Sequence, residues 1–237
     1  MFNDRFSSPR SIIFEDLVKQ TLYKVYAWMT VGLLLTAVTA AVVASNVWLL
    51  GVIFSSKIVF YGIIFAQLGI ALGFSGVLNS RNWALARGLF IAYAVLLGVT
   101  LSAIFLVYNI TTIGMVFAIT ACMFAAMSLY GYTTQANLSV WRSTLFMILF
   151  GVIIASVVNI FVGSAMIDFF LSYVCVFIFS ALTAYDTNRI KALCSDLYYN
   201  YDEDFSQSIA LFGAFTLYLD FVNLFISLLR VFGRRRR

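Results

Sequence analysis

The sequence has no histidine, a single proline and few charged residues, and each shortage excludes something. Without histidine, and with three cysteines that are far apart and form no CxxC pair, a zinc site of the usual kind is excluded. The only proline, Pro9, lies near the N-terminus, so no membrane helix is expected to be kinked by proline. With 11% of its residues charged and 63% apolar, the 237-residue chain is too hydrophobic for an ordinary water-soluble domain.

Seven apolar segments follow one another along the chain. A helix that crosses a bilayer needs about 20 mostly apolar residues, because each residue rises ~1.5 Å through a hydrocarbon core of ~30 Å. The expected segments are 25–46, 58–78, 88–108, 113–130, 144–162, 167–189 and 208–232. Short polar links join them, which favours antiparallel neighbours in one bundle. The sequence therefore predicts an all-α integral membrane protein with seven transmembrane helices.

The polar N-terminal segment, residues 1–24, carries charges of both signs before the first apolar segment. It does not look like a cleaved signal peptide, in which a shorter apolar core comes sooner. We expect it to be a cytoplasmic segment, with residues 11–25 as a candidate amphipathic helix at the membrane surface. Residues 25–232 are expected to form a single membrane domain, and residues 233–237 a basic tail.

The distribution of lysine and arginine predicts that the N-terminus is cytoplasmic. With seven spans, nine basic residues lie on the side of the membrane that holds the N-terminus, whereas the loops on the opposite side hold only Lys57. The nine are Arg5, Arg10, Lys19, Lys24, Arg81, Arg87, Arg142, Arg189 and Lys191. The tail conflicts with this pattern, because an odd number of spans puts Arg230 and residues 234–237 outside. Either the last segment crosses and its basic tail is tolerated outside, or it enters and returns; its length of about 25 residues favours crossing.

Small residues recur within the apolar segments and predict close helix packing. Examples are Gly69 and Gly73 in the second segment and Gly151 in the fifth. In lipid, close approach through small residues takes the place of the hydrophobic drive that water supplies.

Two aspartates, Asp186 and Asp220, lie inside the sixth and seventh segments. A charge at bilayer depth costs several kcal/mol unless it is paired, neutralised or hydrated, so such an acid is a functional candidate. Asp186 has Arg189 one helical turn away, and an interfacial ion pair is the plain alternative for it. Asp220 has no lysine or arginine within two turns. It must therefore find a partner on another helix or hold a proton.

A meeting of Asp186 and Asp220 would have clear chemical consequences. Two carboxylates in a dry site cannot both ionise cheaply, so they would share a proton. A hard cation that prefers oxygen ligands could also displace this proton and bind the two carboxylates. This description fits calcium better than zinc or copper. The pair would then be a gate, a pH sensor and a transient calcium site. Counting ~1.5 Å per residue puts Asp220 about 15–20 Å deep and Asp186 about 10 Å deep if its helix ends near Leu193, so counting leaves the contact open.

An acidic, tyrosine-rich link joins the last two segments. Asp202, Glu203 and Asp204 are candidate residues of a cytoplasmic mouth that gathers cations, and a solvated loop is the alternative. The spacing of the acids does not match an EF-hand loop, which needs a central glycine and a final glutamate.

Five motifs in this chain resemble those of the Bax inhibitor-1 family, also called the transmembrane Bax inhibitor motif family, in its bacterial form. The motifs are Lys24–Thr30 (KVYAWMT), Gly98–Ser102 (GVTLS), Met127–Thr134 (MSLYGYTT), Leu182–Thr187 (LTAYDT) and Leu217–Phe225 (LYLDFVNLF). The resemblance implies a seven-helix bundle in which the last helix is central and surrounded by the other six. It also implies that the family's paired aspartates are Asp186 and Asp220 here.

The chain departs from the family in two places. Some members carry ionisable residues in the second helix that reach the pair, whereas this segment offers only Gln67 as a long polar side chain. Residues 134–137, which are often charged in the family, are uncharged here, so the resemblance supplies no arginine beside the pair. We expect Arg189, Asn223 and Gln67 as supporting polar residues.

The resemblance implies a pH-sensitive calcium leak channel in the bacterial plasma (inner) membrane, and a role in regulating cell death for eukaryotic members. Two alternatives stay open: a membrane partner that modulates a protease or channel without transport of its own, and a proton/calcium exchanger. We expect no enzyme activity, because there is no histidine base and an aspartate dyad would need a substrate cleft. The expected partners are lipid, calcium and a candidate membrane protein. No cofactor and no nucleic acid are expected.

Overall fold

The fold was analysed in a computed structural model that describes residues 9–199 and 203–233. The elements are α1 (Pro9–Ser45), α2 (Val47–Ser55), α3 (Lys57–Asn79), α4 (Trp83–Leu101), α5 (Ile104–Val107), α6 (Ile110–Thr133), the 3-10 helix η1 (Leu138–Trp141), α7 (Arg142–Val162), α8 (Ala165–Tyr199) and α9 (Glu203–Phe232). Polar side chains mark several helix starts: Asn46, Ser56 and Asn82 each accept a hydrogen bond from a backbone N–H of the first turn that follows. The described ranges contain no strand, which confirms the all-α prediction.

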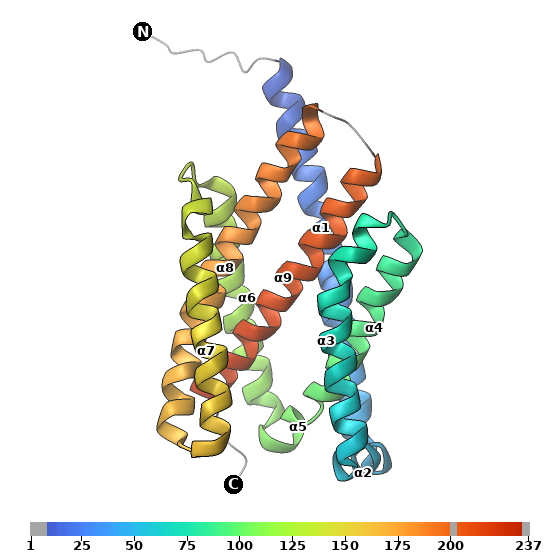
Figure 1. Cartoon of the computed structure of the whole chain (residues 1–237), viewed down its shortest axis with the longest axis vertical. Helices are drawn as coiled ribbons and strands as arrows, with labels where there is room; N and C mark the ends of the chain where they lie inside the picture. The colour runs from blue at the N-terminus through green and yellow to red at the C-terminus, as the bar shows by residue number, and fades with distance from the viewer. Residues whose placement is uncertain (1–8, 200–202, 234–237) are drawn as a thin grey trace.

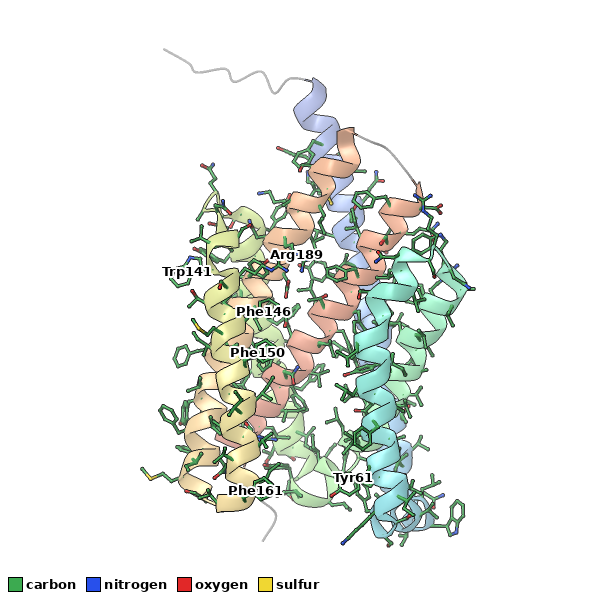
Figure 2. The ribbon with its side chains drawn as sticks, in the orientation of Figure 1. Tyr61, Trp141, Phe146, Phe150, Phe161 and Arg189 are labelled. Atoms are coloured by element: carbon green, nitrogen blue, oxygen red, sulfur yellow. The ribbon has the colours of Figure 1, made fainter. Side chains whose placement is uncertain are left out.

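Seven helical segments are long and apolar enough to cross a membrane. They are Phe14–Ser45, Lys57–Asn79, Trp83–Val107, Ile110–Thr133, Leu138–Val162, Ala165–Ser195 and Asp204–Phe232. Large apolar side chains project from the bundle along its whole length, among them Trp141 and Phe161 near the two ends of one span, which are 59% and 86% exposed (Figure 2). Such a surface suits lipid and not water. The predicted seven-helix membrane protein is confirmed.

The first span begins earlier than the sequence suggested. The structure places residues 9–24 in the same continuous helix as the apolar segment that follows, so the expected boundary at residue 25 is not a break in the helix. The candidate amphipathic helix at 11–25 is therefore the first part of α1. Its Val18, Thr21 and Val25 side chains are buried inside the bundle, so this part of α1 packs against the other helices.

Helix α9 is the central helix of the bundle. In the most apolar stretch of its span, 67% of the residues are buried, against at most 33% in the corresponding stretch of each of the other six spans. It runs obliquely through the molecule and packs against α1, α3, α4, α6 and α8 (Figure 1). Helix α7 packs mainly on α8, at the edge of the bundle. Because α9 starts at the end of the bundle where α1 starts and finishes at the other, it crosses and does not turn back (Figure 1).

The glycines that permit close helix packing are not the ones that the sequence pattern singled out. A Cβ atom added to Gly98 would lie 2.6 Å from the Thr36 carbonyl oxygen of α1, and one added to Gly131 would overlap the Ala184 carbonyl oxygen of α8. By contrast, a Cβ at Gly69 or Gly151 meets no described atom within 4 Å, and the same holds for Gly73. Those three glycines do not mediate packing, and the earlier interpretation of them was wrong.

Candidate functional site

The structure brings Asp186 of α8 and Asp220 of α9 together inside the bundle. Their side chains are buried, with 7% and 5% of the residue surface exposed, and the two carboxyl groups lie within hydrogen-bonding reach of each other. An ionised carboxylate can only accept hydrogen bonds, so a bond between the two requires that one of them carries a proton. One oxygen of Asp220, Oδ2, is buried and has no hydrogen-bond partner within the described ranges.

The two helices that carry the aspartates are both longer than expected. Helix α8 continues to Tyr199, two turns beyond the end assumed from the sequence, so Asp186 lies about 20 Å from its end rather than about 10 Å. Asp220 lies about 26 Å from the start of α9. The oblique path of α9 across α8 makes up the remaining difference (Figure 1). The estimates from the sequence were too shallow for both aspartates, because α8 ends later and α9 starts earlier than expected.

Two arginines supply positive charge near the pair. Arg189 and Arg142 both interact electrostatically with Asp186. The Arg189 guanidinium also lies over the Phe212 ring of α9, 4.9 Å from its centroid, in the space between α8 and α9 (Figure 2). Arg189 was expected, whereas Arg142 was missed. Residues 134–137 supply no arginine, and the additional positive charge comes from Arg142, the first residue of α7.

Two other expected supporting residues are engaged elsewhere. The Gln67 amide of α3 donates hydrogen bonds to Leu96 O (2.9 Å) and Thr100 Oγ1 (2.6 Å) of α4, so it joins α3 to α4 and is not directed to the pair. Asn223 donates to Leu219 O of its own helix at 2.8 Å. The structure therefore brings neither side chain to the two aspartates.

The proposed cytoplasmic mouth is described only in part. Asp202 and the side chain of Glu203 lie outside the described residues. The Asp204 carboxylate accepts hydrogen bonds from Trp83 Nε1 (2.9 Å) and from Arg81 (3.3 Å), at the turn between α3 and α4. Asp204 thus fastens the start of α9 to this turn.

A chain of hydroxyl groups next to Asp186 was also missed by sequence reasoning. Thr187 donates to Thr183 O at 2.8 Å, so its oxygen is free to accept from Ser128 Oγ of α6 at 3.1 Å. The Tyr26 hydroxyl of α1 in turn forms a hydrogen bond with Ser128. The signal was present in the sequence, because Ser128 and Thr187 both fall within the motifs quoted above.

The pair can offer a cation up to four carboxylate oxygens. Calcium takes about 6–8 oxygen ligands, so the rest would have to be water or backbone carbonyls. The part of the chain that the structure describes contains no group of three or more His, Cys, Asp or Glu side chains able to hold a metal.

Comparison with known proteins places the whole chain. Residues 18–237 match the family described as inhibitor of apoptosis-promoting Bax1. The chain is 41% identical over 234 residues to the inner membrane protein YbhL of Escherichia coli, and the aligned region covers 98% of this chain and 100% of that protein. It is 42% identical over 223 residues to an uncharacterized protein of Borreliella burgdorferi, covering 94% of this chain and 95% of the relative. The chain therefore belongs to the Bax inhibitor-1 family.

Proposed function

We propose that this protein is a pH-sensitive leak channel for calcium and that Asp186 and Asp220 form its gate. The observation that carries the proposal is the meeting of two buried carboxyl groups, one of them on the central helix α9. The link of the family to calcium or cation leak supports the same function. A leak needs no catalytic chemistry, and we propose none.

The gate works through one shared proton. At low pH the proton joins the two carboxyl groups and holds α8 against α9, which is the closed state. When the pH rises and the proton leaves, two negative charges face each other in a medium of low dielectric constant and repel or bind a cation. Arg189 and Arg142 offset part of the charge on Asp186. Flux should therefore be low at acid pH and rise with pH.

We also propose that the protein lies in the bacterial inner membrane with its N-terminus in the cytoplasm. The name of the Escherichia coli relative supports the compartment. The excess of lysine and arginine on the N-terminal side supports the orientation. In this orientation α9 starts at the cytoplasmic face.

Calcium efflux from proteoliposomes, measured against pH, tests the gate. We expect Asp186→Asn and Asp220→Asn to remove the pH dependence, because neither variant can form two charges at the site. Asp16→Asn is the matched control, since Asp16 is an exposed carboxylate of α1 far from the pair. Unchanged flux and pH dependence in both site variants would overturn the proposal. Flux that drives protons in a fixed ratio would instead favour a proton/calcium exchanger.

A further inference from the structure

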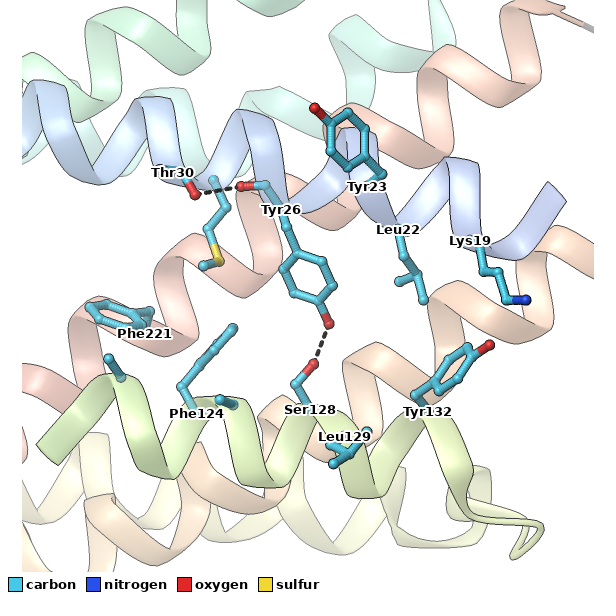
Figure 3. A pocket seen from close by; sticks show the side chains of 13 residues that line it. Lys19, Leu22, Tyr23, Tyr26, Thr30, Phe124, Ser128, Leu129, Tyr132 and Phe221 are labelled. Carbon is cyan, nitrogen blue, oxygen red and sulfur yellow. Dashed lines mark hydrogen bonds between the residues drawn. The ribbon is translucent and has the colours of Figure 1, made fainter. Parts of the chain in front are cut away.

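A groove lies between α1 and α6 on the side of the bundle. Both helices pack against α8 and α9, and the gap between them is a cavity of about 700 Å³. That volume falls within the ~300–1,000 Å³ of typical small-molecule sites. The walls are mostly apolar and include Leu22 and Met29 of α1, Phe124 and Ala125 of α6, and Phe221 of α9. Tyr26 reaches across the groove from α1 to Ser128 (Figure 3).

The depth of the groove determines what can fill it. Its lining residues belong to membrane spans, and it runs from Lys19, near the start of the first span, inward to Phe221 in the middle of the last. An apolar groove that opens sideways within a bilayer faces hydrocarbon and not water. The matching occupant is an acyl chain.

Two lysines and one glutamate lie at the end of the groove nearest the start of α1. Lys19 lines the groove itself, and Lys191 of α8 lines an adjoining cavity of about 430 Å³. Tyr132 lines both cavities, and the Lys191 ammonium lies 2.8 Å from the Tyr132 carbonyl oxygen and 5.5 Å from the centroid of its ring. Glu15 lines the cavity of Lys191 and approaches Lys19 to 3.9 Å. The Glu15 and Lys19 side chains are both more than half exposed, and such pairs are weak. A phosphate can therefore compete for Lys19.

We infer that this groove is a binding site for an anionic phospholipid. One acyl chain lies between α1 and α6, and the phosphate and anionic headgroup lie between Lys19 and Lys191. Tyr132 has the amphipathic ring that suits the headgroup level. Charge complementarity at the two lysines favours an anionic lipid over a zwitterionic one.

Native mass spectrometry of the purified protein tests the site, with palmitoyl-oleoyl phosphatidylglycerol compared against phosphatidylcholine of the same chains. We expect tighter binding of phosphatidylglycerol, with a loss of about fivefold for each lysine removed in Lys19→Gln and Lys191→Gln. Lys57→Gln, at the other end of the bundle, is the matched control and should bind as the wild type does. Equal binding of the two lipids by the wild type would overturn the proposal.

The acyl-chain part is tested separately by filling the groove. Ala125 lines it, whereas Ala126, the next residue of α6, is exposed and does not. Ala125→Trp should abolish tight binding of phosphatidylglycerol, while Ala126→Trp should leave it unchanged. Both variants are first checked for wild-type thermal stability, and Ala125→Leu replaces a tryptophan variant that fails this check. Equal binding by the variants at positions 125 and 126 would contradict the site.

Discussion

Asp220 is the residue whose surroundings are hardest to reconcile with a permanent charge. Its carboxyl group is buried, its nearest acidic neighbour is Asp186, and its Oδ2 atom has no hydrogen-bond partner in the described part of the chain. An unsatisfied polar atom away from water costs roughly 1–3 kcal/mol, and an unpaired charge costs more. A proton on the pair lowers this cost, because it removes one charge and adds a hydrogen bond.

Stability should therefore fall as the pH rises. Deprotonation of the pair leaves two like charges in the apolar interior of the folded protein, whereas an unfolded chain exposes them to water. We expect the thermal unfolding midpoint in detergent to drop when the pH is raised through the loss of the shared proton. Asp220→Asn should remove this drop, and Asp16→Asn should retain it. A midpoint of the wild type that does not change with pH would argue against a shared proton.

The contact between α6 and α8 sets the position of Asp186. Gly131 has no room for a side chain against the Ala184 carbonyl, and Asn188 donates a hydrogen bond to the Gly131 carbonyl at 3.1 Å. These contacts are one turn or less from Asp186 along α8. The site is therefore held by close packing of backbones on one side and by α9 on the other.

Gly131→Ala should destabilise the protein. The added methyl group must push α6 away from α8, and overpacking of this kind costs about 1–3 kcal/mol. Gly151→Ala is the matched control, because the new methyl group there meets no described atom within 4 Å and alanine is the better helix former. Thermal unfolding in detergent compares the two. Equal stability of both variants would show that the α6–α8 contact has room for a methyl group at position 131.

The start of α9 depends on Asp204. Removing its carboxylate in Asp204→Ala breaks the bonds from Arg81 and Trp83, so the first turns of α9 should open more often. We expect faster amide hydrogen exchange in the first two turns of α9 and a cost of about 0.5–1.5 kcal/mol. Asp16→Ala should leave exchange in α9 unchanged. Unaltered exchange in Asp204→Ala would mean that other contacts hold this end.

The sequence predicted the number of helices well and their ends less well. Hydropathy alone located seven apolar segments, because lipid imposes the same requirement on every span. It ended the sixth apolar segment at residue 189 and allowed the helix to continue to about Leu193, but α8 continues to Tyr199, which lengthens the distance from Asp186 to the end of the helix. It could not reveal that Gly131, and not Gly151, is the tight contact. Both features depend on which face of a helix meets a neighbour, and periodicity is weak in helices that are apolar all round.

The candidate site could be predicted only in part for the same reason. Two acids in apolar segments stand out because a charge inside a membrane is energetically costly. Arg142, by contrast, is an ordinary basic residue at the start of a span, and only the packing of α7 on α8 brings it into interaction with Asp186. Gln67 looked like a supporting residue because of its type, yet its partners are on α4. Three-dimensional packing decides such roles.

At the scale of the whole molecule, seven spans place the two ends of the described chain on opposite sides of the membrane. In a variant with its three cysteines replaced by alanine, we expect Asn109→Cys and Phe232→Cys to react with a membrane-impermeant maleimide added to intact cells. Ser80→Cys, in the turn between α3 and α4, should react only after the membrane is permeabilised. If Phe232→Cys, like Ser80→Cys, reacted only after the membrane is permeabilised, the result would contradict the crossing of α9.

The central claim is that Asp186 and Asp220 share a proton that calcium displaces. Infrared difference spectroscopy of the protein in lipid nanodiscs measures this directly through the C=O stretching band of a protonated carboxyl group. A shared proton should give a band at low pH that disappears when the pH is raised, or when calcium is added at constant pH, and that is absent from the double variant Asp186→Asn/Asp220→Asn. A band that persists in the double variant, or one that calcium does not change, would contradict the account.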